Sequence, residues 1–267
     1  MIRRSNLFWG SVLLAIGGLL LLENLGLLDF LGVSVWSLIL PLGLIGLGIW
    51  VLWSSSHPQA AFETEELSFP LEGTEEAHVS LDFGAGEVIL SGQPAPGVLL
   101  SGTFDGVTSE LTHEGGRTRL TLKTPPIVGW PISIGPGYRR RWSFSVSDAV
   151  PVSLTVHSGA SDNRLDLRAL KVRSLRLESG ASSTHVTLPE NAGYTEVRGS
   201  GGAASITLHV PEGVAAHIHA GGAIASVSVN QARFPRVADG YQSPDYAAAA
   251  NKVDIHLDMG VGSISIS

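Results

Sequence analysis

The stretch Val156-His157-Ser158-Gly159-Ala160 is one of four copies of a pattern that begins with an apolar residue and ends in small ones. The other copies are Leu177-Glu178-Ser179-Gly180-Ala181, Val197-Arg198-Gly199-Ser200-Gly201 and Ile218-His219-Ala220-Gly221-Gly222. The copies start at intervals of 21, 20 and 21 residues, and another apolar residue follows eleven positions after each start. Such a period indicates a chain of stacked structural repeats.

Each copy combines an alternating strand, a corner of Gly, Ala and Ser, and a second alternating strand. One such rung cannot bury its apolar side chains alone, so neighbouring rungs must stack at about 4.8 Å per layer. Two tighter copies, at 81–90 and 257–266, share one design and are expected to form the first and last rungs. We therefore predict an all-β soluble domain, a single-stacked β-solenoid with about 20–21 residues per rung.

An antiparallel β-sandwich would also give many short strands joined by turns. A sandwich, however, has no reason to repeat the same corner sequence at a fixed interval. In a solenoid, a corner glycine supplies positive φ and leaves no Cβ to collide with the next rung. The predicted corner glycines are Gly84, Gly86, Gly159, Gly180, Gly201, Gly221, Gly260 and Gly262.

Two stretches interrupt the repeat and predict insertions between rungs, at 124–142 and at 234–251. Proline and glycine are concentrated in the first, and the second contains two prolines and a run of alanines. The predicted β-solenoid then covers residues 78–267, preceded by a linker and first strand at 57–77. The remaining part, residues 1–56, has the composition of a membrane anchor.

Two apolar segments, 5–22 and 33–53, are each long enough as a helix to cross a hydrocarbon core of about 30 Å. The second has Trp36 near one end and Trp50 with Trp53 at the other, as expected for indoles at the headgroups. A cleaved signal peptide is the alternative for the first segment. No small-x-small cleavage site closes that segment, and a signal peptide does not explain the second. We predict a two-helix transmembrane hairpin in the plasma (inner) membrane.

Arg3 and Arg4 are the only positive charges near the two segments. Positive charges favour the cytoplasmic side of a membrane, so the N-terminus is expected there. Two spans return the chain to the same side. The multi-pass topology therefore predicts a cytoplasmic β-solenoid.

The chain has a net charge of −7 and no cysteine. Because Arg3 and Arg4 balance Glu23 and Asp29, the whole net charge falls on the predicted soluble domain. An acidic domain argues against nucleic-acid binding, and the lack of cysteine excludes disulfides and thiolate sites. No nucleophile elbow, zinc-protease motif or phosphate-binding loop occurs. We expect no enzymatic activity, no cofactor and no metal site.

His157, Glu178, Arg198 and His219 hold the same place in successive copies and are predicted to form one outward column. Such a column could bind a metal ion or sense pH, but Arg198 interrupts it, and a solvated polar face explains the pattern. His217 lies on the same strand face as His219, and this pair is an equally weak indication of a metal site.

Two further stretches are candidate contact sites. If the domain is cytoplasmic, a basic cluster could contact a partner or the anionic lipid beside the anchor, although a solubilising loop tip also explains it. Its residues are Tyr138, Arg139, Arg140, Arg141 and Trp142. Residues 263–267 form an alternating strand with nothing after it to cap the stack, and an uncapped edge invites a partner strand. We predict self-association or partner binding through Ile264 and Ile266.

The pattern Leu-Asp-x-Gly-x-Gly-x-Φ-x-Φ at 81–90 and 257–266 resembles the signature of toast-rack β-solenoid domains. Residues 8–10, 23–28 and 36–41 resemble the LiaI/LiaF-type transmembrane region, which in bacteria is often fused to toast-rack domains. The resemblance implies a cell-envelope stress protein, as in LiaF-type proteins that restrain a sensor histidine kinase.

These observations together predict a non-enzymatic, membrane-anchored scaffold or sensor that acts through protein–protein contacts in a bacterial cell-envelope stress response. Its expected partners are the lipid bilayer and a protein, either a sensor kinase or a second copy of itself. The alternative is an outward-facing, adhesin-like module that binds envelope ligands. The side of the membrane that the rungs occupy separates the two hypotheses.

Overall fold

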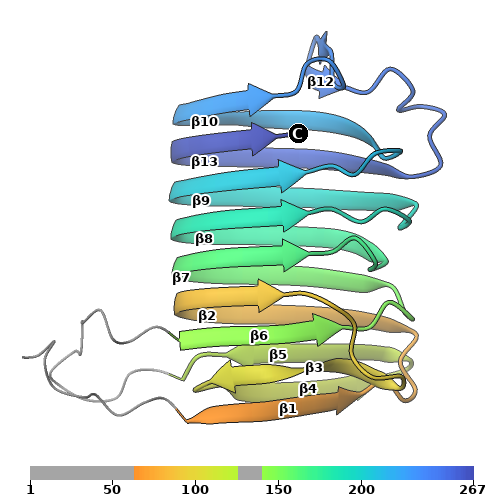
Figure 1. The fold of residues 1–267 in the computed structure, drawn as a ribbon, viewed down its shortest axis with the longest axis vertical. Coiled ribbons are helices and arrows are strands. Elements are labelled where there is room, and N and C mark those ends of the chain that lie inside the picture. The colour runs from red at the N-terminus through yellow and green to blue at the C-terminus, as the bar shows by residue number, and fades with distance from the viewer. Residues whose placement is uncertain (1–62, 126–139) are drawn as a thin grey trace, which may run out of the picture. The chain divides into compact units, whose positions relative to one another are not determined.

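The computed structural model describes residues 63–125 and 140–267, which belong to one compact unit of the chain. These residues form β-strands and no helix (Figure 1). The strands are β1 (Thr64–Pro70), β2 (Glu76–Leu90), β3 (Val98–Asp105), β4 (Thr108–Glu114), β5 (Arg117–Lys123), β6 (Arg140–Val146), β7 (Val152–Asp166), β8 (Val172–Thr187), β9 (Tyr194–His209), β10 (Ala215–Val229), β11 (Arg236–Val237), β12 (Gly240–Gln242) and β13 (Lys252–Ile266). Within this part of the chain no helix is long and apolar enough to cross a membrane. The spans predicted at 5–22 and 33–53 lie outside the described residues.

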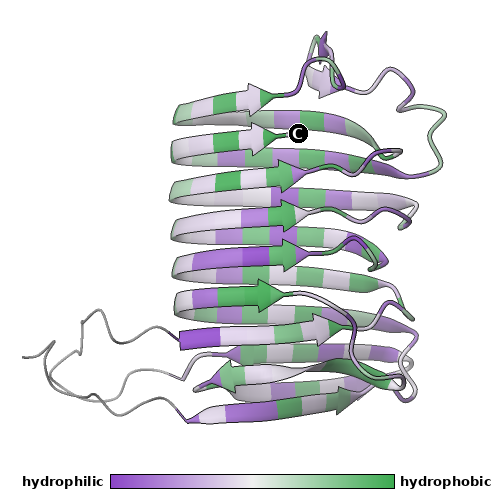
Figure 2. Ribbon diagram, in the orientation of Figure 1, coloured by the Kyte–Doolittle hydropathy of each residue, from purple (hydrophilic) through white to green (hydrophobic). Residues whose placement is uncertain are grey.

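Six long strands form a parallel stack in the order β2, β7, β8, β9, β13, β10. Each bends near its middle, so that one strand supplies both arms of a rung (Figure 1). Along each arm apolar and polar residues alternate (Figure 2), and the apolar ones meet in buried columns between rungs. One such column consists of Val79, Leu154, Leu175, Val197, Ile255 and Ile218. The predicted β-rich, solenoid-like architecture is confirmed.

The register between rungs differs from the predicted alignment at one step. Leu154 lies opposite Leu175, which is the predicted offset of 21 residues. Leu175 lies opposite Val197, an offset of 22, so the predicted interval of 20 between these rungs is wrong by two residues. Side chains alternate across a strand with period two, so a slip of two leaves the inward and outward sets unchanged. The apolar pattern alone cannot detect such a slip.

The order of the rungs in space also departs from their order in the chain. β13 pairs with β9 on one side and with β10 on the other, so the last rung in sequence lies between the two preceding ones (Figure 1). The segment between β10 and β13, which contains the β11–β12 hairpin, leads the chain back by one rung. The long insertion predicted at 234–251 therefore serves this return.

This arrangement overturns the predicted edge at the end of the sequence. Ile264 and Ile266 are 1% and 2% exposed and lie between two paired strands. The open edge belongs instead to the second arm of β10, 224–229, because β12 pairs with β10 only at His217 and Ile218. Edge-strand binding through Ile264 and Ile266 would require opening the sheet.

The other end of the stack is built from shorter strands. β5 pairs with the first arm of β2 and β6 with its second arm, so these two strands form one more rung. The insertion predicted at 124–142 thus falls between the two strands of this rung, but its predicted end is wrong, because β6 already begins at Arg140. Antiparallel strands cover this end: β4 pairs with β5, β3 pairs with β6, and β1 pairs with β3.

The corners of the stacked rungs form a column of glycines in close contact. The column consists of Gly84, Gly159, Gly180, Gly202 and Gly260. A Cβ at Gly180 would lie 2.8 Å from the carbonyl oxygen of Gly159, and a Cβ at Gly260 would lie 2.6 Å from that of Gly202. Side-chain atoms do not approach a backbone oxygen so closely, so the stacking at these two corners requires glycine.

The predicted corner glycines agree only in part with this column. Gly201 and Gly221 lie outside it, because Gly202 holds the corner of β9 and Ala223 that of β10. Positive φ, the other predicted reason for glycine, occurs in the predicted set only at Gly86 and Gly262.

Candidate functional site

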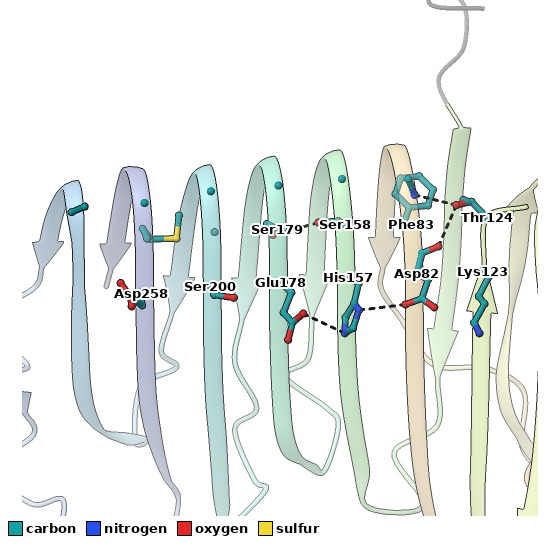
Figure 3. A pocket seen from close by; sticks show the side chains of 18 residues that line it. Asp82, Phe83, Lys123, Thr124, His157, Ser158, Glu178, Ser179, Ser200 and Asp258 are labelled. Carbon is teal, nitrogen blue, oxygen red and sulfur yellow. Dashed lines mark hydrogen bonds and ion pairs between the residues drawn. The ribbon is translucent and has the colours of Figure 1, made fainter. Parts of the chain in front are cut away.

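An open groove of about 890 Å³ runs along the corners of the rungs from β2 to β10 (Figure 3). The glycine column forms its floor, so backbone atoms are accessible there. We call this surface the corner groove. The side chains that line it include Asp82, Phe83, Lys123, Thr124, His157, Ser158, Glu178, Ser179, Ser200, Asp258 and Met259.

One side of the corner groove is a row of outward side chains on five successive rungs. The row consists of Asp82, His157, Glu178, Ser200 and Asp258. His157 lies between two carboxylates, with Nδ1 3.5 Å from Oδ1 of Asp82 and Nε2 3.8 Å from Oε2 of Glu178 (Figure 3). These side chains are 38–46% exposed, and exposed pairs of this kind contribute about 0–1 kcal/mol to stability. The row is therefore held loosely and is acidic in character.

The predicted column of four polar residues does not exist as such. His157 and Glu178 are neighbours, but Ser200 follows Glu178 in the next rung because of the two-residue shift in register. Arg198 and His219 lie in an adjacent row. That adjacent row consists of Arg176, Arg198, His256 and His219 and borders a smaller hollow of about 400 Å³.

Behind the corner groove, polar side chains reach into the interior of two rungs. Asn163 is 1% exposed and donates its side-chain amide to Oγ of Ser158 at 3.3 Å and to Oγ1 of Thr184 at 3.0 Å. Ser158 and Ser179 are in turn 3.3 Å apart at their hydroxyl oxygens. These hydrogen bonds link β7 and β8 just inside the corner. They hold in place the part of the groove that Ser158 and Ser179 line.

The predicted basic cluster is divided by the start of β6. Tyr138 and Arg139 lie outside the described residues. Trp142 is fully buried and Arg140 is 8% exposed, and burial lowers the pKa of Arg140. The prediction of a lipid or partner contact through these two residues is wrong, because alternation in β6 turns both toward the interior.

Arg141 is the described member of the basic cluster whose side chain is exposed, at 65%. Its Nη2 lies 2.8 Å from Oε2 of Glu87, and its backbone N–H donates to Oδ2 of Asp105 at 2.9 Å. Glu87 also pairs with Arg164. Arg141 therefore belongs to a small surface network of ion pairs.

The corner groove has the properties of a binding surface. Its histidine contacts two carboxylates instead of a serine hydroxyl, and an activated nucleophile requires a base within hydrogen-bonding reach. The groove is open along its length, so it does not exclude water from a reacting group. Acidic side chains beside exposed backbone can instead contact a partner at several rungs.

The predictions identified His157 and Glu178 but missed Asp82, Ser200 and Asp258 as members of the row. A signal for all five was present in the sequence. Each lies two positions before a glycine of the corner column, and residues two apart face the same side of a strand. The residue two positions before each corner glycine belongs to the row, provided that Gly202 is taken as the corner of β9.

Comparison with known proteins relates the chain to one family and one fold. Residues 58–209 match the N-terminal domain of toast_rack, DUF2154, whereas no match was found among the curated proteins. A candidate cell adhesion protein from Clostridium sporogenes ATCC 15579 is 20% identical, with a TM-score of 0.71 over 77% of this chain and 98% of that one. A candidate adhesin from Bacteroides fragilis NCTC 9343 is 8% identical, with a TM-score of 0.32 over 77% and 97%. The family match covers more than half of the sequence, and the chain therefore belongs to the toast-rack family.

Proposed function

We propose that the protein is a non-enzymatic, membrane-anchored binding module that acts through protein–protein contacts at the corner groove. The observation that carries this proposal is the unbroken row of outward side chains along five rungs. A partner segment laid along the groove would meet one polar side chain about every 4.8 Å. Such a regular surface suits an extended chain better than a compact small molecule.

The charge of the row indicates the kind of segment that would bind. Asp82, Glu178 and Asp258 supply carboxylates on three of the five rungs, and His157 and Lys123 are the neighbouring basic side chains. Lysine and arginine side chains on the partner would complement the carboxylates and speed association. An extended, basic protein segment is therefore the partner that the groove fits.

The membrane anchor and the physiological role are the parts of the proposal that rest on the sequence. The apolar segments 5–22 and 33–53 support the anchor, and Arg3 with Arg4 supports a cytoplasmic solenoid. The resemblance to LiaI/LiaF-type regions supports a role in a cell-envelope stress response, with a sensor kinase as one candidate partner.

An outward-facing, adhesin-like module is the second candidate function. The observation in its favour is the likeness of fold to the Clostridium sporogenes protein, which is named as a candidate cell adhesion protein and is covered over 98% of its length. In this alternative the same groove faces an envelope component outside the cell.

Site-specific photocrosslinking in cells tests the contact surface. A photoreactive amino acid at Ser200, in the groove, should give a covalent adduct with another protein. The same residue at Arg173, exposed on the first arm of β8 and absent from the groove, is the matched control. Glu178→Lys with Asp258→Lys should abolish the adduct at Ser200, because both carboxylates are replaced by positive charge. Adducts that persist after this reversal, or none at Ser200, would contradict the proposal.

The absence of cysteine allows a clean test of the topology. Ser200→Cys provides one thiol, which a membrane-impermeant maleimide should label only after the cells are permeabilised. Labelling in intact cells would favour the adhesin-like alternative and reject the cytoplasmic placement.

A further inference from the structure

A second cluster of polar side chains lies at the outermost rung, where the β11–β12 hairpin approaches the first arm of β10. His217 and His219 are two positions apart on β10 and therefore share a face. Asp239 lies in the turn between β11 and β12, and β12 pairs with β10 at His217. One ligand atom from each of these three residues lies within 4.8 Å of the other two. Nε2 of His217 lies 3.6 Å from Oδ2 of Asp239.

Asp254 on the neighbouring β13 faces the other ring nitrogen of His217. Its Oδ1 lies 3.4 Å from Nδ1 of His217 and 3.2 Å from Nε2 of His256. This oxygen is buried and makes no hydrogen bond of good geometry in the structure. A buried carboxylate oxygen requires a donor. Nε2 of His256 is the nearer ring nitrogen, and a small rotation of the His217 ring would let a proton on its Nδ1 bond to the same oxygen.

That protonation state leaves the lone pair of Nε2 of His217 directed toward Asp239. A carboxylate behind a histidine that fixes the tautomer in this way is the usual outer-shell partner of a metal ligand. The ring of His219 is also held, because it stacks on His256 with centroids 5.3 Å apart and an interplanar angle of 14°. Two imidazoles are therefore positioned by neighbours on β13 beside an exposed carboxylate.

We propose that His217, His219 and Asp239 bind a divalent transition metal ion, with Zn²⁺ as the best match, and that Asp254 orients His217. Two imidazole nitrogens and one carboxylate oxygen form a ligand set that suits zinc. Tetrahedral coordination at about 2.0–2.1 Å separates neighbouring ligand atoms by about 3.4 Å. The 3.6 Å between His217 and Asp239 is close to this value. Asp239 is 63% exposed in a turn, so its side chain has room to adjust toward the two imidazoles.

With three protein ligands, the fourth position is open to water or to a ligand from a partner. The ion would also join the β11–β12 hairpin to β10 by a bond that the backbone does not supply, since only two residue pairs link β10 and β12. Metal binding would thus hold the β11–β12 hairpin in place over the outermost rung.

Calorimetric titration of the purified full-length chain with ZnCl₂, after chelator treatment, tests the site. We expect one Zn²⁺ per chain, with Asp254→Asn weakening binding about 10- to 100-fold, as for loss of an outer-shell partner. Asp239→Asn and His219→Ala remove ligands and should weaken binding more. His157→Ala and His113→Ala, at histidines outside the cluster, are the matched controls and should bind as the unaltered chain does.

Replacement of Zn²⁺ by Co²⁺ provides an independent readout, because four-coordinate Co²⁺ absorbs visible light far more strongly than six-coordinate Co²⁺. The intense band should appear with the unaltered chain and be lost with Asp239→Asn. Because Asp239 and His219 are exposed, neither substitution threatens folding. No binding, or binding unchanged by both substitutions, would overturn the proposal.

Discussion

The parallel stack and its N-terminal end, which β1 and β3–β6 form, fill their interiors in different ways. In the stack, aliphatic side chains meet their equivalents on the next rung, and the corners approach closely through glycine. At the N-terminal end, Trp142 contacts Phe83 and Phe104 edge to face, at centroid distances of 4.9 and 5.7 Å. Antiparallel strands replace the next rung there. Repetition allows small, matching surfaces, and where repetition stops, bulky rings and covering strands are required.

Substitution of a corner glycine should have the largest effect on the stack. A Cβ at Gly159 would collide with the carbonyl oxygen of Gly84, whereas a Cβ at Gly221 has no atom within 4 Å. We expect Gly159→Ala to lower the free energy of unfolding by more than about 3 kcal/mol, and Gly221→Ala to change it by less than about 1 kcal/mol. Urea unfolding measures both, and equal midpoints would show that close stacking does not require glycine.

Removal of the aromatic centre at the N-terminal end should have a comparable effect. Trp142→Ala deletes a fully buried indole, for which the expected loss of unfolding free energy is about 3–5 kcal/mol. Arg141→Ala removes an exposed charge from the preceding position and should cost about 1 kcal/mol or less. If Trp142→Ala unfolds at the same denaturant concentration as the unaltered chain, the indole is not part of this core.

Substitution by alanine should cost more stability on an enclosed rung than at the paired position on the terminal rung, and this difference is of intermediate size. Ile264 lies between two rungs, and its partner Val227 on β10 is packed from one side only. Ile264→Ala should cost about 2–5 kcal/mol, and Val227→Ala about 1 kcal/mol or less because that side chain is partly solvated already. Thermal unfolding of the two variants gives the comparison, and a larger loss at Val227 would indicate that the terminal rung is covered in solution.

The smallest effect is expected in an exposed turn of the stack. A side-chain hydrogen bond from Arg168 lowers the pKa of Asp166. A lowered carboxyl pKa stabilises the fold above the pKa of the unfolded chain, and this stability is lost as pH falls through the folded value. Arg168→Ala should move the pKa of Asp166 toward its ordinary value, as followed by NMR titration of the carboxyl carbon. An unchanged titration would show that the pair does not form in solution.

The sequence identified the rung because each rung carries its own signal. Alternation marks the inward side chains, and glycine marks the corner, so the β-rich stack could be predicted without a partner strand in view. The same alternation was present at Trp142, Phe144 and Val146, and it would have placed Trp142 inside a strand. The positive charge of the neighbouring arginines instead favoured an interpretation as a surface cluster.

The sequence indicates much less clearly how neighbouring rungs align and in which order they stack. A shift of two residues preserves alternation, so the alignment of Leu177 with Val197 was as consistent with the pattern as the observed pairing of Leu175 with Val197. The segment between β10 and β13 can reach either side of β10, so its sequence does not specify the insertion of β13. The contact of His217 with Asp254 depends on that long-range arrangement. The transmembrane hairpin and the stress-response role stay predictions.

The place of β13 between β9 and β10 has a consequence for how the protein is made. β10 leaves the ribosome before β13 is synthesised, so the nascent chain cannot complete its sheet by adding rungs in order of synthesis. Until β13 emerges, β9 and β10 each present an edge that is not yet paired with its native neighbour, and such edges are open to wrong pairing. Folding of this region therefore has to wait until β13 has been synthesised.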